Sequence, residues 1–232
     1  MDDTKELLAA GVRHLLADFE EAFRVYERLS ANAERRAGRE PAPPVKIEAV
    51  TWPAGGGMLV LADGRALVLE CAVEGDDLPR EALGRLERAG AADGHGAAEG
   101  AGAADGAGAD SPTSGAVAPG ARVYAIVVTS SWELAATDPA FDALGELCTR
   151  CGLVWSGGLA VGGGALVAAQ AGEARMGRRR RARSEGIDLV IAAVRSNAGV
   201  DELPGVDGDI VDAPCSVPRF LYRHQSFGDR HQ

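Results

Sequence analysis

The segment from Ala121 to Val167 constrains the fold more than any other stretch of this 232-residue chain. Residues 123–128 form a short, nearly all-apolar run rich in β-branched side chains, which ends in the polar turn Thr129-Ser130-Ser131. This pattern is typical of a strand that is buried on both faces and opens into a loop at its carboxyl end.

A helix and a second strand follow directly. The start signal Thr137-Asp138-Pro139 and apolar residues at helical spacing predict a helix from Ala140 to Arg150. The apolar run from Leu153 to Val161 predicts another buried strand. A strand, a helix and a strand in succession form a βαβ unit, which requires a parallel sheet covered by helices. We therefore expect an α/β fold in which the rest of the chain completes or decorates that sheet.

Composition limits the number of domains and the kinds of partner. With 46% hydrophobic residues the chain can bury one good core or two small ones. We expect a single domain over residues 1–232, because a large fraction of the length is Ala and Gly, which pack little. The formal net charge of −10 argues against nucleic acid, since a polyanion is normally bound by a basic face. No apolar run is long enough to span a bilayer, and the acidic start Met1-Asp2-Asp3 is unlike a secretory signal. These features predict a cytoplasmic protein with no membrane partner, and the four scattered cysteines predict reduced thiols.

The N-terminal part of the sequence predicts two helices and three strands. Apolar residues at steps of three and four predict an amphipathic helix from Thr4 to Ala37 that covers one face of the sheet. Val45–Trp52 alternates apolar with polar residues, as expected of an edge strand with one wet face. Met58–Leu61 and Ala66–Val73 predict two further strands, which either form a hairpin or run parallel after a loop. A helix from Leu78 to Ala89 follows.

The stretch 90–120 is dominated by Ala, Gly and Asp. A segment with almost no large apolar side chain cannot offset the entropy of ordering it, so we expect a disordered, Ala/Gly-rich insertion. His95 lies alone in this stretch, and we interpret it as a solvated side chain, because a metal site would need further ligands.

The C-terminal part contains an arginine run, a helix and a tail. The four consecutive arginines Arg178–Arg181 predict a solvated face or a helix start, with an anion-docking site as the alternative. An apolar stripe from Ile187 to Val194 predicts the last long helix, which ends near Asn197-Ala198-Gly199. Phe220, Leu221 and Tyr222 stand in an otherwise charged tail, which suggests that the end of the chain docks back on the body.

The motifs that could carry chemistry are weak. Cys148-Thr-Arg-Cys151 closes a predicted helix instead of opening one, so we interpret this pair as structural rather than redox-active or metal-binding. The glycines at 157–158 and 162–164 match no nucleotide-binding motif and indicate only that a helix or a ligand approaches the backbone closely. The four histidines, His14, His95, His224 and His231, lie in helix-face, linker or tail contexts. We therefore nominate neither a catalytic side chain nor a metal ligand.

Several segments in order resemble the flavodoxin-like proteins of the NAD(P)H-dependent FMN reductase type. Leu61 to Pro79 resembles that family's apolar strand, flavin-side loop and following helix, and residues 123–133 look like its next strand and second flavin-side loop. Leu153 to Val167 and the closing Val217-Pro-Arg-Phe-Leu-Tyr222 look like the last strand region and the tail of one branch of the family. The resemblance covers about half of the chain, and the order of the segments carries it.

The resemblance implies a three-layer flavodoxin-like parallel sheet with a ligand outside the carboxyl ends of its strands, at the point where strand order reverses. The cofactor would be FMN, NADPH or NADH would be the electron donor, and the flavin ring would lie between the loops 71–77 and 129–133. Trp132 would stack on the ring or cover the core. Such reductases position the cofactor and leave the chemistry to it, and they are often homodimers. The implied flavin-side residues are Ala72, Val73, Glu74, Gly75, Thr129, Ser130, Ser131 and Trp132.

The sequence departs from this family at its N-terminus. Family members begin with a strand and a Gly/Ser/Thr-rich loop that holds the FMN phosphate, whereas this sequence starts with its first predicted helix, so the sheet is expected to be incomplete there. Three interpretations follow: an oxidoreductase that holds the phosphate with residues 178–183, a non-catalytic binding or regulatory module without FMN, or a truncated frame whose first strand lies upstream of Met1.

Overall fold

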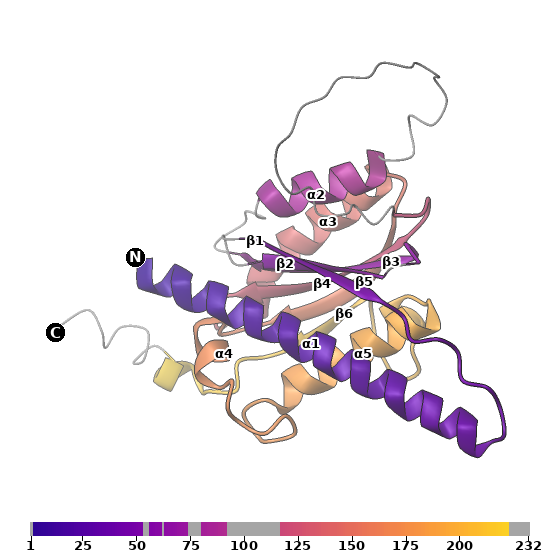
Figure 1. Cartoon of the computed structure of the whole chain (residues 1–232). Coiled ribbons are helices and arrows are strands. Elements are labelled where there is room, and N and C mark those ends of the chain that lie inside the picture. The colour runs from indigo at the N-terminus through magenta and orange to yellow at the C-terminus, as the bar shows by residue number, and fades with distance from the viewer. Residues whose placement is uncertain (1, 53–55, 62, 74–79, 92–116, 223–232) are drawn as a thin grey trace, which may run out of the picture.

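The computed structural model describes residues 2–52, 56–61, 63–73, 80–91 and 117–222, which form one six-stranded sheet with helices on both sides (Figure 1). In chain order the elements are α1 (Asp2–Arg36), β1 (Ile47–Trp52), β2 (Gly56–Leu61), β3 (Ala66–Val73), α2 (Arg80–Ala91), β4 (Arg122–Thr129), η1 (Leu134–Thr137), α3 (Asp138–Arg150), β5 (Val154–Val161), α4 (Ala165–Ala169), α5 (Arg181–Ser196), η2 (Val200–Glu202) and β6 (Ile210–Ala213). The βαβ unit predicted from the sequence is confirmed as β4, α3 and β5, because β4 and β5 pair in parallel.

The strands lie in the sheet in the order of the chain, from β1 to β6. Strands β3 to β6 pair in parallel, whereas β1 and β2 join as an antiparallel hairpin extension at the β3 side. The sheet is therefore mixed and mostly parallel, and the predicted reversal of strand order is wrong. The antiparallel pairing of β2 with β3 has a local cause. Gly64, at φ +69°, closes a turn in which its N–H donates to the Leu61 carbonyl at 2.8 Å. So short a connection can only join antiparallel strands, which settles the alternative left open for β2 and β3.

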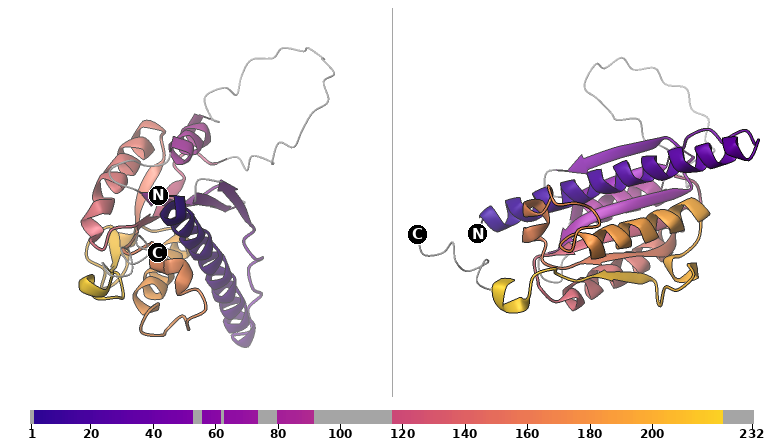
Figure 2. Two further views of the ribbon diagram at one scale, coloured as in Figure 1. Left: turned by 90° about the vertical axis from the view of Figure 1, so that its left-hand side faces the viewer. Right: turned by 90° about the horizontal axis from the view of Figure 1, so that it is seen from below.

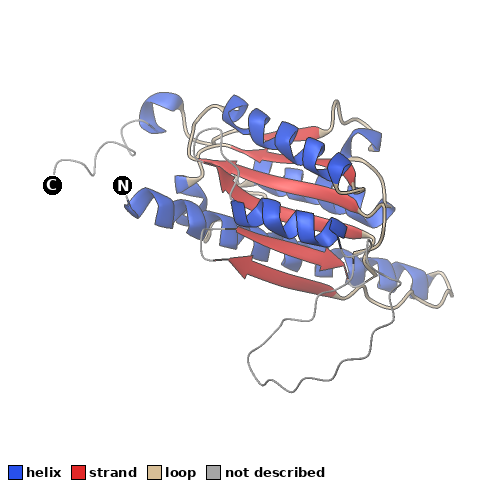
Figure 3. Cartoon of the chain, turned by 90° about the horizontal axis from the view of Figure 1, so that it is seen from above, coloured by secondary structure: helices blue, strands red, loops and turns tan. Residues whose placement is uncertain are grey.

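Two apolar cores lie on opposite faces of the sheet. On the first face the sheet is covered by α1, α4 and α5 (Figure 2), which pack against strand residues such as Val68, Tyr124 and Leu159. On the second face α2 and α3 cover residues such as Leu67 and Val127, and Figure 3 views the sheet from that side. The amphipathic character predicted for the first helix is confirmed, because one stripe of α1 is buried on the sheet: Leu8, Val12, Leu15, Leu16, Phe19 and Phe23.

Successive connections leave the sheet towards different faces. The chain leaves β4 for α3 on the second face, but it leaves β5 for α4 and α5 on the first face. Because β6 continues the strand order in the same direction, the crossover through α5 has the opposite hand to the two crossovers before it. Crossovers of both hands in one sheet are rare. Their consequence here is that the connections after β4 and β5 separate at the carboxyl edge, the arrangement that opens ligand crevices in α/β sheets.

Tyr124 ties the centre of the sheet to the last long helix. Its side chain is fully buried, and its hydroxyl donates to the Ala198 carbonyl oxygen at 2.7 Å, just beyond the end of α5. Asn197 ends this helix in the left-handed conformation, at φ 52°, as predicted for the Asn197-Ala198-Gly199 stop. The short elements α4 and β6 are not predicted by the sequence pattern.

The insertion predicted for residues 90–120 is wrong at both of its ends. Residues 92–116 lie outside the described part of the chain. Gly90 and Ala91 still belong to α2, Val117 is buried in the second core, and the Ala118 N–H donates to the Gly64 carbonyl at 3.0 Å. Both ends of the predicted stretch are therefore part of the fold.

Candidate functional site

The carboxyl ends of the parallel strands share one edge of the sheet. In the strand register Val73 at the end of β3 lies opposite Thr129 of β4, and Val161 of β5 lies opposite Ala213 of β6. Ligands in open α/β sheets bind outside this edge. The sequence-based expectation that the strands beginning at Ala66 and Val123 lie side by side and point the same way is confirmed.

The predicted flavin-side residues fall at this edge as far as the described residues extend. Ala72 and Val73 end β3, facing the first and the second core respectively. Glu74 and Gly75 lie outside the described residues. Thr129 ends β4 next to Val73, and its buried hydroxyl accepts a hydrogen bond from the Ser131 N–H at 3.0 Å. The two predicted loops thus start from adjacent strand ends.

The loop after β4 is held by the C-terminal tail. The Tyr222 hydroxyl donates to the Ser130 carbonyl, and the Trp132 indole N–H donates to the Val217 carbonyl at 2.8 Å. The Arg219 guanidinium lies 5.8 Å from the centre of the Trp132 ring. The predicted docking of the tail is confirmed for Tyr222, whereas its neighbours Phe220 and Leu221 are exposed. Trp132 is therefore engaged with the tail on at least one side.

The glycine run after β5 brings backbone segments together. The N–H of Gly163 donates to the Ser131 carbonyl and that of Gly164 to the Thr129 carbonyl, each at 2.8 Å. A Cβ added at Gly164 would overlap the side chain of Leu8 in α1, and one added at Gly163 would overlap Cys215. The close approach predicted for this run is thus to α1, to the loop after β4 and to the strand end of β6.

A cavity of about 130 Å³ opens beside this run, at the carboxyl ends of β5 and β6. It is lined by Gly162, Gly163, Leu166, Gln170, Arg178, Arg179, Ala182, Arg183, Pro214, Cys215 and Ser216. The lining contains three arginines and no carboxylate, although the whole chain carries a net charge of −10. Such a local excess of positive charge favours a negatively charged ligand.

Arg183 is the most unusual member of this lining. It is 8% exposed, and its guanidinium has no hydrogen bond or ion pair within the parts of the chain that the structure describes. Burial, and then the nearby Arg180, lower the pKa of Arg183 to about 10, while Asp18 and Cys215 oppose that change. The side chain therefore remains a cation at neutral pH, buried without a directly bonded counter-ion.

Arg180 shows that the arginine run is not simply a solvated face. Its guanidinium is buried, donates to the carbonyls of Ala171 and Glu173 at 2.7 Å each, and pairs with Asp18 of α1. Arg181 begins α5, so the prediction of a helix start is confirmed, but that of a solvated face is wrong for Arg180. The reason is a contact between positions 162 residues apart in the chain, which supplies the buried cation with a carboxylate.

Glu70 is a further buried ionisable residue, and no motif in the sequence points to it. It lies in the middle of β3, on the face covered by α1, and is fully buried. Neither carboxyl oxygen has a hydrogen-bond partner in the described chain. Burial, reinforced by the charge of Asp18, raises the pKa of Glu70 well above its ordinary value. The signal in the sequence is one acidic residue inside the apolar run Ala66–Val73.

The cysteine pair has the surroundings of a structural site. Cys148 is buried in α3, and burial raises the pKa of its thiol to about 12, the opposite of what a reactive thiolate needs. Cys151 follows the end of the helix. Within the described residues no three His, Cys, Asp or Glu side chains are grouped so as to hold a metal ion. His95, His224 and His231 lie outside those residues.

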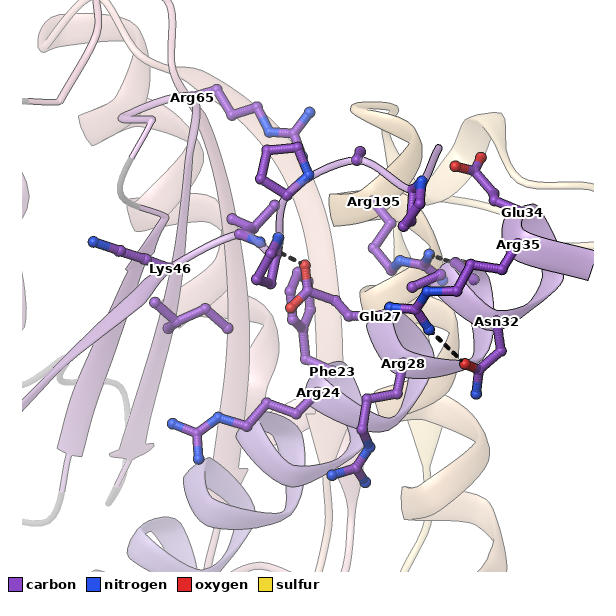
Figure 4. Close-up of a pocket in the computed structure, with 18 of the residues that line it drawn as sticks. Phe23, Arg24, Glu27, Arg28, Asn32, Glu34, Arg35, Lys46, Arg65 and Arg195 are labelled. Atoms are coloured by element: carbon purple, nitrogen blue, oxygen red, sulfur yellow. Dashed lines mark hydrogen bonds between the residues drawn. The ribbon is translucent and has the colours of Figure 1, made fainter. Parts of the chain in front are cut away.

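A larger cavity, of about 1200 Å³, lies at the other edge of the sheet, between the C-terminal half of α1 and residues 41–48 (Figure 4). Its wall includes Arg65, which precedes β3, so the cavity adjoins the amino end of that strand. Polar groups on the two sides of this cavity bond to each other: the Val45 N–H donates to the Glu27 carboxylate of α1 at 2.8 Å. Its cations are exposed or half-buried, unlike Arg183. The carboxyl edge is therefore the better candidate for a ligand site.

Helices in the described part of the chain do not combine the length and apolar character needed to cross a bilayer. Comparison with known proteins found no matching family model, no matching curated protein and no matching solved structure.

Proposed function

We propose that the protein is a diverged flavodoxin-like oxidoreductase of the NAD(P)H-dependent FMN reductase type, with flavin bound at the carboxyl edge of the sheet. The observation that carries the proposal is the parallel pairing of β3 with β4, which starts the loops after Val73 and Thr129 from adjacent strand ends. Helices on both faces of the sheet and the separating connections after β4 and β5 agree with a ligand crevice at this edge.

The residues present favour the phosphate of FMN more clearly than its ring. Arg183 and its cavity offer a buried cation to an anionic group, whereas Trp132 already holds the tail. The midpoint between β3 and β4 is two strand spacings, about 10 Å, from the midpoint between β5 and β6. That separation is comparable to the length of a ribityl phosphate chain. The bound flavin would supply hydride acceptance and transfer, and this chain's residues would hold it and exclude water.

The visible absorbance of the purified protein tests this proposal. We expect a flavin band that survives gel filtration, either as purified or after FMN is added. A protein that stays colourless after reconstitution, at FMN concentrations well above micromolar, would remove the oxidoreductase proposal. Hydride transfer from NADPH or NADH to the bound flavin, followed as bleaching of the same band, would then identify the electron donor.

A flavodoxin-like binding or regulatory module without FMN is the second candidate. Two observations favour it: β3 is flanked by the antiparallel β2, and the loop after β4 is tied down by Tyr222 and Gly163. This candidate predicts that FMN leaves the melting temperature unchanged, because a ligand stabilises only the state that binds it.

The truncated-frame interpretation meets an obstacle in the sheet. In the expected flavodoxin-like order the missing strand would pair with β3, but β2 already forms hydrogen bonds with that edge from Gly56 to Val60. An additional parallel strand could join only at the outer edge of β1 or of β6.

A further inference from the structure

We propose that the cavity beside Arg183 binds a tetrahedral oxyanion: phosphate itself or the phosphoryl group of a small molecule. The site deepens the proposed function if the ligand is FMN, but it rests on its own residues and stands without flavin. It lies at the carboxyl ends of β5 and β6, where α5 begins.

The buried charge of Arg183 favours an anionic ligand. A largely buried arginine, such as Arg183 at 8% exposure, loses hydration and normally compensates for it through a carboxylate or several carbonyl acceptors. Arg180 has both, from Asp18 and from two carbonyls. Arg183 has neither within the described residues, yet it lines an open cavity. An oxyanion in that cavity would supply the missing acceptors, because the planar guanidinium of Arg can form bidentate hydrogen bonds with phosphate.

The first turn of α5, a helix of 16 residues, also favours an anion. The Arg181 N–H donates to the Gly177 carbonyl and the Ser184 N–H to the Arg180 carbonyl, each at 2.9 Å. Between them, the N–H groups of Ala182 and Arg183 have no acceptor among the described residues, and both residues line the cavity. Unpaired N–H groups at a helix start, together with the helix dipole, favour an anion at this position.

The size of the cavity and the charges at its wall also fit an oxyanion. A cavity of about 130 Å³ exceeds the roughly 30 Å³ that one water occupies, and it has room for a five-atom oxyanion. Arg178, whose side chain is exposed, stands at the wall without a carboxylate partner in the described chain, so it can close over the ligand. The carboxylates of Glu173 and Asp18 are already engaged, with Arg179 and Arg180 respectively.

Titration with inorganic phosphate at constant ionic strength, with chloride as the balancing salt, tests the site. We expect the melting temperature of the wild-type protein to rise with phosphate, and alkylation of the half-buried Cys215 at the cavity wall to slow. Arg183→Met should weaken phosphate binding about ten-fold or more, since it removes a charge-assisted pair. Arg181→Gln is the matched control, because Arg181 starts the same helix but is exposed, pairs with Glu185 and is absent from the lining. It should leave phosphate binding within about two-fold.

Cys151 serves as the internal control for alkylation, because it lies at the end of α3 and outside the cavity. If Arg183→Met does not fold, Arg178→Gln replaces it, since the Arg178 side chain lines the cavity but is exposed. The proposed site would be overturned if phosphate raised the melting temperature equally in wild type and in the folded cavity variant, or if it did not slow alkylation of Cys215.

The same alkylation assay identifies the ligand. Protection of Cys215 by FMN but not by riboflavin would indicate the phosphoryl group of a small molecule, and protection by phosphate alone would indicate the free ion. If the protein binds phosphate but never binds flavin, the proposed oxyanion site stands and only the proposed oxidoreductase function is rejected.

Discussion

Replacing Asp18 with leucine is expected to lower the free energy of unfolding by about 3 kcal/mol, because the change leaves the buried Arg180 cation without its carboxylate. The loss should fall at the lower end of the usual range for a broken buried pair, since Arg180 keeps its two carbonyl acceptors. Urea unfolding followed by circular dichroism gives the free energy, provided that the slope with denaturant is unchanged.

The double variant Asp18→Leu with Arg180→Leu separates the ion pair from the packing around it. Two apolar side chains can replace a buried pair at little cost, so the double variant should regain most of the stability that the single one loses. A single variant within about 1 kcal/mol of wild type would show that Asp18 and Arg180 do not form a buried pair. Strictly additive losses in the double variant would lead to the same conclusion.

Replacing Glu70 with leucine is expected to raise the free energy of unfolding at neutral pH by about 1–3 kcal/mol, because it removes a buried carboxyl group without hydrogen-bond partners. Glu70 also predicts a pH dependence. Its pKa is raised in the folded state, so the folded protein keeps a proton that the unfolded chain releases above its ordinary value of 4.5. The contribution of Glu70 to stability is therefore most favourable below pH 4.5 and declines as the pH rises towards the raised pKa.

Glu70→Gln isolates this ionisation, since it keeps a polar side chain of the same size. The difference in unfolding free energy between Glu70→Gln and wild type should be small near pH 4.5 and should grow in favour of the variant by pH 7.5. Parallel stability curves for the two proteins over that interval would contradict a neutral, buried Glu70. A wild-type protein that is more stable than both variants at pH 7.5 would mean that the carboxylate has a partner.

The local elements could be predicted from the sequence because each is coded by neighbouring residues. The spacing of apolar side chains predicts both the buried strand at 123–128 and the amphipathic α1. That spacing does not predict the short β6: only Ile210, Val211 and Ala213 are apolar there, and the chain around them is polar and rich in Gly and Pro. Its pairing with β5 comes from tertiary contact, which a short window cannot show.

The candidate site depended on contacts that are distant in the chain. The sequence predicts adjacent loops after β3 and β4, because parallel strand ends meet at one edge. Arg180 forms an ion pair with Asp18, whereas Arg183 lines the cavity. The sequence does not distinguish the two, because nothing in the neighbouring residues marks either arginine. The direction of β2 likewise depended on whether residues 62–65 turn back or cross over. Only the folded structure shows which arginine has a carboxylate partner and in which direction β2 pairs.

Comparison of FMN with riboflavin in one fluorescence titration tests most directly whether the carboxyl edge and the Arg183 cavity form a single ligand site. The two ligands share the ring and differ in the phosphate, so their affinity ratio measures what the cavity contributes. FMN should bind about ten-fold or more tightly than riboflavin, and inorganic phosphate should reduce that preference. Equal affinities for FMN and riboflavin, or no binding of either, would contradict the assignment of this edge as a phosphoryl-flavin site.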